Sequence, residues 1–185
     1  MGFGEGFQPL LEACRLGEDW AWRHVYEDLA PVLLRYLRAR GAREPEDLVG
    51  ETFLRVVRSV ASFEGDERDF RAWVFTIARR LLIDQHRRSA RRPASAMPLE
   101  EVVDLGEVGD VEEDALRSLA EARVRLVLET LTSDQRDVLT LRILADLTVE
   151  QVARVLEKSP GAVKALQARG IEAIRRAMAV GTVTL

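Results

Sequence analysis

Apolar side chains recur at intervals of three and four residues along most of the chain, which is the spacing of helices with one buried face. No segment of strand length alternates apolar and polar positions convincingly. The pattern therefore predicts an all-α fold. The expected helices cover residues 8–17, 19–40, 45–61, 67–92, 113–131, 133–145, 148–157 and 159–179.

Three of these helices carry apolar faces that we expect to form the core of the N-terminal half. The helix over 19–40 contributes Trp20, Val25, Leu29, Leu33 and Leu37. The helix over 45–61 contributes Leu48, Phe53, Val56, Val57 and Val60. The helix over 67–92 contributes Phe70, Trp73, Val74, Ile77 and Leu81. Gly17 and Gly41 are expected to end the first two helices, because glycine adopts the left-handed conformation that commonly follows a helix.

The helical pattern breaks at residues 93–112, which contain two prolines and two glycines but few large apolar side chains. Such a composition cannot bury enough apolar surface to fold alone. The sequence therefore predicts two small helical domains, over residues 1–92 and 113–185, joined by a flexible linker over 93–112.

Charge is distributed unevenly, which changes what the net charge of −4 means. Residues 1–92 carry sixteen Lys and Arg against fifteen Asp and Glu, and residues 115–185 carry eleven against eight. The eight acids of residues 93–114 have no base among them, so the connector is acidic and the two lobes are not. The acidic average, which alone would argue against nucleic-acid binding, therefore excludes no nucleic-acid partner.

The cysteine count and the N-terminus narrow the setting. Cys14 is the single cysteine, so an internal disulfide or a cysteine-rich metal site is impossible. No apolar run approaches the roughly 18 residues that span a bilayer. The first residues lack the basic start and apolar stretch of a signal peptide. We expect a cytoplasmic protein without membrane insertion.

The C-terminal part contains the pattern of a helix-turn-helix. Thr148 and Gln151 form a capping box at the start of one short helix, and Ser159 with Pro160 starts a second helix directly afterwards. The second helix presents Lys164, Gln167 and Arg169 between Val163, Leu166 and Ile174. In a helix-turn-helix this second helix lies in the major groove of DNA. The alternative is a solvated helical hairpin without any DNA contact.

A basic run ends the helix over 67–92, with six arginines in the fourteen residues 79–92. Such a cluster favours contact with phosphates, although basic residues also stabilise the negative end of a helix dipole. Trp73 and Phe75 lie near the run and could stack on unpaired bases, but the apolar stripe favours a core position for Trp73.

Three motifs in order resemble the extracytoplasmic-function (ECF) sigma factors of the sigma-70 family. Residues 47–56, DLVGETFLRV, are similar to the family's DLxQETFLRV stretch. Residues 70–84, FRAWVFTIARRLLID, are similar to its FRAWLFTIARNLLID helix, and residues 131–139, LTSDQRDVL, to its LPPEQREVL motif. The resemblance covers nearly the whole chain outside the linker.

The resemblance implies a sigma factor that binds core RNA polymerase through the β′ clamp and the β flap and recognises the −10 and −35 promoter elements. A helical anti-sigma factor is a further expected partner. The residues implied for polymerase binding are Asp47, Leu48, Glu51 and Phe53. Those implied for the melted −10 element are Phe63, Arg79, Arg80, Asp84, Arg87 and Arg88, with a buried plug as the alternative role of Phe63. Those implied for the −35 element are Ser159, Ala162, Lys164, Ala165, Gln167, Ala168 and Arg169 within the helix-turn-helix over 148–169.

The chain departs from the family pattern at several of these positions. Gly50 replaces a usual Gln, Arg80 replaces a frequent Asn, and Glu157 replaces the usual Gly of the helix-turn-helix turn. Residues 165–167 replace a common Ser-Arg-Leu, which removes one expected arginine contact. The base preference of this chain at both elements therefore cannot be transferred from the family.

Two other classes of protein remain to be weighed. Catalysis is disfavoured, because His24, His86 and Cys14 have no spacing that indicates a metal or nucleophile site, and no cofactor is implied. The GFGEGF segment at residues 2–7 lacks the preceding strand of a dinucleotide site. A stand-alone helix-turn-helix regulator would be a dimer on palindromic sites, whereas a sigma factor is a monomer on an asymmetric promoter.

Overall fold

The computed structural model describes residue 3, residues 6–91 and residues 126–179, and these are helical apart from short turns. The N-terminal part holds α1 (Phe7–Leu16), α2 (Asp19–Ala39), α3 (Pro45–Ser59), the short 3₁₀ helix η2 (Val60–Ser62) and α4 (Glu67–Arg91). The C-terminal part holds α6 (Ser133–Ile143), α7 (Val149–Leu156) and α8 (Pro160–Ala179). The expected all-α fold is confirmed. The expected linker over 93–112 and the start of the helix predicted at 113 lie outside the described residues.

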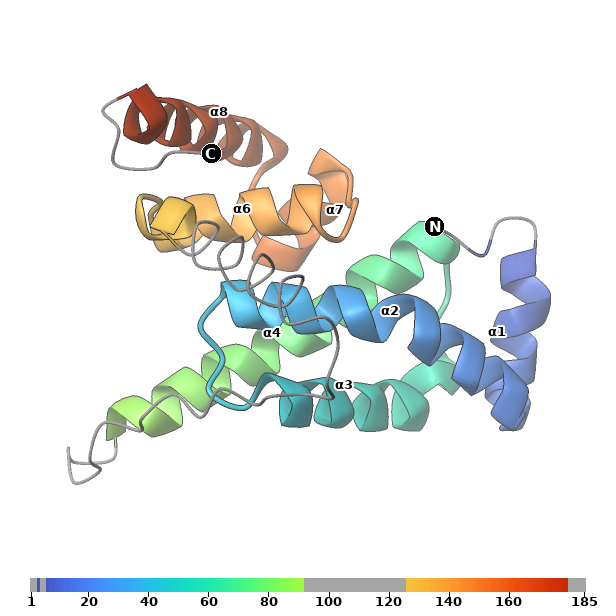
Figure 1. Ribbon diagram of the computed structural model, residues 1–185. Coiled ribbons are helices and arrows are strands. Elements are labelled where there is room, and N and C mark those ends of the chain that lie inside the picture. The colour runs from blue at the N-terminus through green and yellow to red at the C-terminus, as the bar shows by residue number, and fades with distance from the viewer. Residues whose placement is uncertain (1–2, 4–5, 92–125, 180–185) are drawn as a thin grey trace, which may run out of the picture.

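In the N-terminal domain α2, α3 and α4 pack along one another, and α1 crosses the end of α2 (Figure 1). Leu29, Leu33 and Leu37 of α2 are completely buried, as their spacing predicts. Two predicted core positions are wrong: 58% of the Trp20 surface and 47% of the Val57 surface are exposed.

Both errors lie at the edge of an apolar face. Ala21, not Trp20, faces the core at the start of α2. In α3 the buried face runs through Val49, Phe53 and Val56, and Val57 lies about 100° further around the helix. Periodicity thus located each buried face but extended it by one residue too many.

In the described part of the C-terminal domain α6, α7 and α8 pack together, and the starts of α7 and α8 are capped as the sequence indicates. The Thr148 hydroxyl accepts from the Gln151 amide, and the Gln151 side chain accepts from the Thr148 amide. A second capping box, not predicted, joins Thr132 and Gln135 at the start of α6. Gly170 lets α8 lie close to α6, since a Cβ added there would lie 2.9 Å from Leu139 Cδ1.

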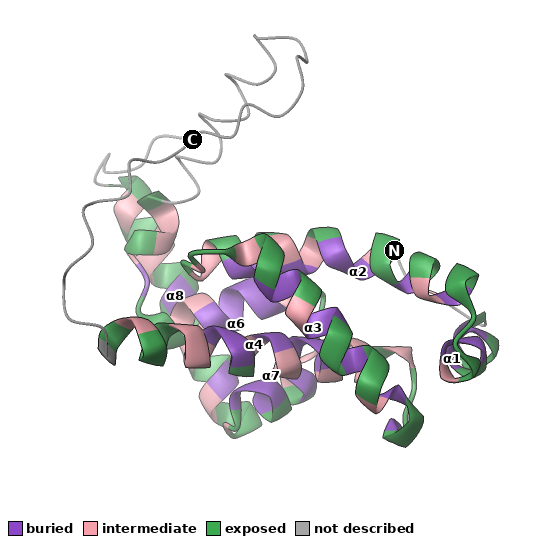
Figure 2. Cartoon of the chain, turned by 90° about the horizontal axis from the view of Figure 1, so that it is seen from below, coloured by how far each residue is buried: buried purple, intermediate pink, exposed green. Residues whose placement is uncertain are grey.

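The two domains lie directly against each other. α7 packs on α4, and α6 contacts α2 (Figure 1). Buried apolar side chains form one cluster that continues from the N-terminal domain into α6 and α7, whose inner residues are buried together with those of α4 (Figure 2). No helix within the described ranges has the length and apolar character that crossing a membrane requires.

Candidate nucleic-acid and protein interfaces

The exposed face of α3 carries part of the set predicted to bind polymerase. Asp47 is exposed, and Glu51 is half-buried with its carboxylate 2.8 Å from the Arg55 guanidinium. Leu48 and Phe53 are buried, and the Phe53 ring lies 4.7 Å from that of Tyr26. The acids therefore form the surface, while the two apolar residues support it from inside the domain.

Sequence reasoning missed the apolar residues on this same face. Leu54 is 57% exposed and lies three residues after Glu51, so the two side chains are neighbours on the helix surface. Val57, also exposed, continues the row by one further step. An exposed apolar row beside acids is the composition of a protein-binding surface, and the spacing from Asp47 was the signal that could have identified it.

The arginines predicted to bind the −10 element point to two different sides of α4. Arg80, Arg87 and Arg88 are exposed and Asp84 is half-buried, which places all four on one solvent-facing side, because residues four and seven or eight apart share a helix face. Arg79 instead points toward the C-terminal domain, with only 22% of its side chain exposed. The exposed set can hold nucleic-acid phosphates.

The turn before α4 is closed around Phe63, which is buried among aromatic rings. Its ring lies 5.2 Å from Phe70, edge-on, and 5.1 Å from Trp73. Phe75 is completely buried edge-on against Tyr36, so the expectation that it could stack on bases is wrong. In this conformation the Phe63 side chain is a core residue and its ring offers no exposed face to a base.

Helix α1 holds the backbone of this turn, a role that the sequence did not indicate. The Arg15 guanidinium donates to the Phe63 carbonyl, and the Gln8 amide donates to the Gly65 carbonyl at 3.2 Å. Gly65 has a φ of 143°, and a Cβ there would lie 2.8 Å from the Cβ of Asp69. Because α1 holds two carbonyls of the turn and Gly65 cannot accept a side chain without a clash, the turn is held in one conformation.

The helix-turn-helix has its second helix open to solvent. Glu157 occupies the turn in the left-handed conformation, with φ 55° and ψ 42°. The Ser159 hydroxyl accepts from the Ala162 amide at 3.2 Å, which starts α8 as predicted. Of the residues implied for the −35 element, Ser159, Lys164, Ala165, Ala168 and Arg169 are exposed, and Ala162 and Gln167 are partly exposed. This face can enter a major groove without rearrangement of the domain.

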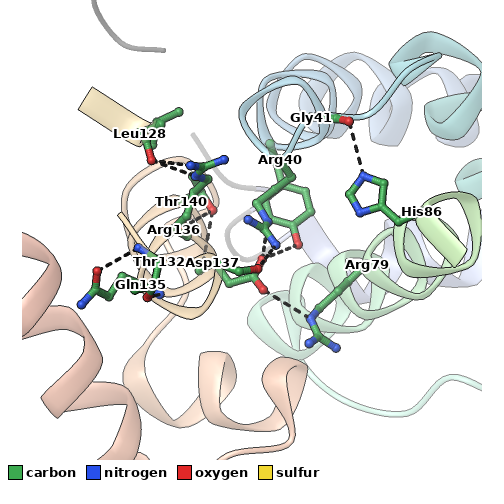
Figure 3. Close-up of polar contacts among 12 residues, drawn as sticks. Arg40, Gly41, Arg79, His86, Leu128, Thr132, Gln135, Arg136, Asp137 and Thr140 are labelled. Carbon is green, nitrogen blue, oxygen red and sulfur yellow. Dashed lines mark hydrogen bonds and ion pairs between the residues drawn. The ribbon is translucent and has the colours of Figure 1, made fainter. Parts of the chain in front are cut away.

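A buried ion-pair cluster joins the two domains (Figure 3). The Asp137 carboxylate of α6 lies 2.6 Å from the Arg40 Nε and 3.9 Å from the Arg79 Nε. The Tyr36 hydroxyl donates to the same carboxylate at 3.5 Å. Burial raises the pKa of Asp137 although both arginines act to lower it, and burial likewise raises the pKa of Tyr36.

The residues considered for catalysis are not brought together. Burial raises the pKa of the Cys14 thiol to about 11, so the thiol is protonated at neutral pH and a poor nucleophile. The His86 ring contacts the Gly41 carbonyl at 3.3 Å, and the His24 ring lies against that of Phe3. Within the described ranges, no group of three or more His, Cys, Asp or Glu side chains is arranged to hold a metal ion.

Comparison with known proteins covers both parts of the chain. Residues 23–92 match sigma-70 region 2, and residues 127–176 match sigma-70 region 4. The ECF RNA polymerase sigma factor ShbA of Streptomyces griseus is 33% identical over 168 residues, which cover 86% of this chain and 88% of ShbA. The chain belongs to the ECF sigma factors of the sigma-70 family.

Further relatives extend the comparison. The ECF RNA polymerase sigma factor BldN of Streptomyces coelicolor is 36% identical over 170 residues, 90% of this chain but 64% of BldN, so the chain spans less than two thirds of that relative. Among solved structures, CnrH in complex with the cytosolic domain of CnrY has a TM-score of 0.68 at 22% identity, with 92% of this chain and 96% of that chain covered. At that identity the likeness concerns the fold. The family assignment therefore rests on the matches to regions 2 and 4 and on the sequence relatives.

Proposed function

We propose that this ECF sigma factor binds core RNA polymerase and directs promoter-specific initiation by recognising a −10 and a −35 element. The observation that carries the proposal is the pairing, in one chain, of an exposed basic face on α4 with an exposed reading face on α8. One face suits the phosphates of a strand and the other suits the major groove of a duplex. Two such elements on one monomer match an asymmetric promoter.

The roles of the two domains follow from these surfaces. Residues 1–92 would bind polymerase and the −10 strand, residues 113–185 would bind the −35 duplex, and residues 93–112 would connect them in the cytoplasm. On α4 the exposed Arg80, Arg87 and Arg88 would contact phosphates, with Asp84 beside them. Asp47 and Glu51, with the exposed Leu54, would form the polymerase-binding surface of α3, and Leu48 and Phe53 would support it. An anti-sigma partner stays a prediction of the family resemblance.

The decisive experiment is transcription by core RNA polymerase, with and without the protein, from a pool of the host's promoter fragments. We expect transcripts that require the protein, and the aligned sequences upstream of their start sites should contain two separated elements. No protein-dependent transcript and no co-migration with core polymerase would contradict the proposal. Dimers that bind palindromic duplexes would then identify a stand-alone helix-turn-helix regulator.

Charge reversal on α3 tests the polymerase-binding surface. Asp47→Lys should weaken binding to core polymerase by about 10-fold, because an acid that faces a basic partner becomes a repulsive charge. Glu150→Lys is the matched control: it also replaces an acid in the first turn of a helix, so it loses the same dipole interaction, but it lies on α7. Equal affinities of the two variants, measured by fluorescence anisotropy, would remove α3 from the interface.

A further inference from the structure

The contact between the domains is built from polar pairs as well as apolar packing. Besides the Asp137 cluster, Arg154 of α7 lies 2.6 Å from the Asp69 carboxylate of α4. The Arg40 guanidinium also donates to the Ser133 hydroxyl at 3.0 Å. These pairs connect both α6 and α7 to the N-terminal domain, so the contact has a defined orientation.

Asp137 is the central residue of this contact. It is 5% exposed, and the ion-pair and hydrogen-bond partners of its carboxylate within residues 6–91 and 126–179 come from the other domain: Tyr36 of α2, Arg40 at the C-cap of α2 and Arg79 of α4 (Figure 3). A carboxylate is buried only where its charge is matched, so an arrangement that shifted it away from Arg40 and Arg79 would leave a buried charge unpaired. The cluster therefore selects one way of docking the domains.

The same cluster adds orientation more than stability to the docking. Burial and the nearby Asp134 carboxylate raise the pKa of Asp137, although Arg40 and Arg79 act to lower it. A buried ion pair of this kind gives orientation and little net stability. Opening of the domains therefore does not have to break a strongly stabilising ion pair at Asp137.

The docked arrangement treats the two DNA-binding surfaces differently. α7 lies on α4, and Arg79 is engaged by Asp137 with 22% of its side chain exposed. Arg80, on the exposed side of α4, lies 3.9 Å from Glu157 of the helix-turn-helix turn. The reading face of α8 points away and stays exposed. Docking thus covers part of the basic helix and leaves the duplex-reading helix free.

We propose that the free protein holds its C-terminal domain docked on α2 and α4 through Asp137, and that this docking withholds Arg79 from a DNA strand until the domains separate. The claim that docking withholds a DNA-binding residue rests on the proposed function, whereas the docking itself does not. The C-terminal domain acts as an internal cover for the α4 surface. Release by polymerase would then couple exposure of the −10 surface to assembly.

The docking is tested by a distance measurement on the free, full-length chain. Spin labels on Arg58→Cys of α3 and Arg175→Cys of α8, both exposed positions, report the separation of the domains in a Cys14→Ala background. We expect one narrow distance distribution by pulsed electron spin resonance. Asp137→Arg should broaden it and shift it to longer distances, because a third positive charge would face Arg40 and Arg79.

Asp134→Arg is the matched control for this variant. Asp134 lies one turn earlier on α6, and its partner Lys158 belongs to the same domain, 2.9 Å away. The control makes the same charge change at an exposed position of α6 that acts on Asp137 only through space, so its distance distribution should stay much closer to that of the parent than the distribution of Asp137→Arg does. An equal shift in both variants would overturn the assignment to Asp137.

A variant of Arg40, on the N-terminal side of the contact, tests the docking without placing an arginine in α6. Arg40→Glu should open the domains by placing a second carboxylate beside Asp137, and the double variant Arg40→Glu with Asp137→Arg should restore much of the docked distribution. Unchanged distributions in both single variants, with helical content retained by circular dichroism, would overturn the docking.

The withholding has a separate readout. If docking withholds Arg79 from a strand, Asp137→Arg should bind a single-stranded DNA oligonucleotide about 3- to 10-fold more tightly than the parent, because the apparent affinity rises with the fraction of protein that is competent to bind. Unchanged or weaker binding by a variant whose domains have separated would overturn the withholding. The distance measurement contains no polymerase and no DNA. A negative result there would contradict the docking and leave the proposed function intact, and a failed transcription experiment would leave the docking intact.

Discussion

Glu157 stands at the tightest backbone position of the helix-turn-helix. Its φ of 55° lies in the left-handed region, where a side chain costs about 1 kcal/mol relative to glycine. The ion-pair distance of 3.9 Å to Arg80 joins two groups that are each more than half exposed, so it returns little of that cost. Glu157 therefore makes the turn less stable than glycine would at this position.

We predict that Glu157→Gly raises the free energy of unfolding by about 0.5–1 kcal/mol, since glycine adopts this conformation without a Cβ clash but loses more entropy on folding. Chemical denaturation followed by circular dichroism measures the change. Glu150→Gly is the control, because the same replacement at a helical position of α7 should destabilise by about 1 kcal/mol. Destabilisation by both changes would contradict the strain at residue 157.

At this scale the sequence predicted the residues whose role is local. The Thr148–Gln151 capping box and the Ser159 cap are formed as their spacing indicates, because a cap bonds to amides two or three residues away. Phe75 was uncertain because its surroundings depend on Tyr36, a residue of another helix. Local bonds are readable in a sequence, whereas a contact across the core is not.

Two helical glycines have opposite surroundings at the scale of whole elements. Gly50 lies on the exposed side of α3, and a Cβ there would meet nothing within 4 Å. Gly170 lies where α8 crosses α6, and a Cβ would come within 2.9 Å of Leu139. One glycine weakens its helix without a packing reason, and the other sets the distance between two helices.

We predict that Gly50→Ala stabilises the protein by about 1 kcal/mol, the difference in helix propensity between the two residues. Gly170→Val should destabilise it by about 1–3 kcal/mol, because the added side chain must displace Leu139 from a packed core. Thermal unfolding of the two variants beside the parent measures both effects. A stabilising Gly170→Val would show that α6 and α8 have room to separate.

Element positions could be predicted well because each buried face repeats along its own helix. The bounds of α2, α3 and α4 differ from the expected ones by one or two residues. The predicted polymerase-binding surface lacked one apolar residue because periodicity assigned Val57 to the core, whereas the buried face of α3 is narrower and leaves Val57 exposed. The width of a face depends on the neighbouring helix, which periodicity does not describe.

The arrangement of the whole molecule depends on partners far apart in the chain. Tyr36 and Asp137, which meet in the domain contact, are 101 positions apart. Asp137 itself reads in the sequence as one more polar residue of an amphipathic helix. Its burial results from the docking of α6 on α2, so only the folded structure reveals it.

The raised pKa of Asp137 gives the docked arrangement a pH dependence with a definite sign. The docked form binds the proton more tightly than the open form, so this carboxyl favours docking fully below its ordinary pKa of 3.8. That contribution is lost as the pH rises through the raised value. The groups that face the carboxylate are Tyr36 of α2, Arg40 at the C-cap of α2, Arg79 of α4 and Asp134 of its own helix.

We therefore predict that the docked fraction, measured with the same two spin labels, increases as the pH falls from 7.5 toward 4.5. Asp137→Asn is the matched control, because the amide keeps the shape of the side chain but cannot titrate, while the exposed Asp69–Arg154 pair remains in both proteins. Any pH dependence left in the control belongs to such other pairs, so the difference between the two curves isolates Asp137. A docked fraction that fell with acidification in the parent but not in the control would mean that the arginines dominate the carboxylate and that docking is a tight ionic latch.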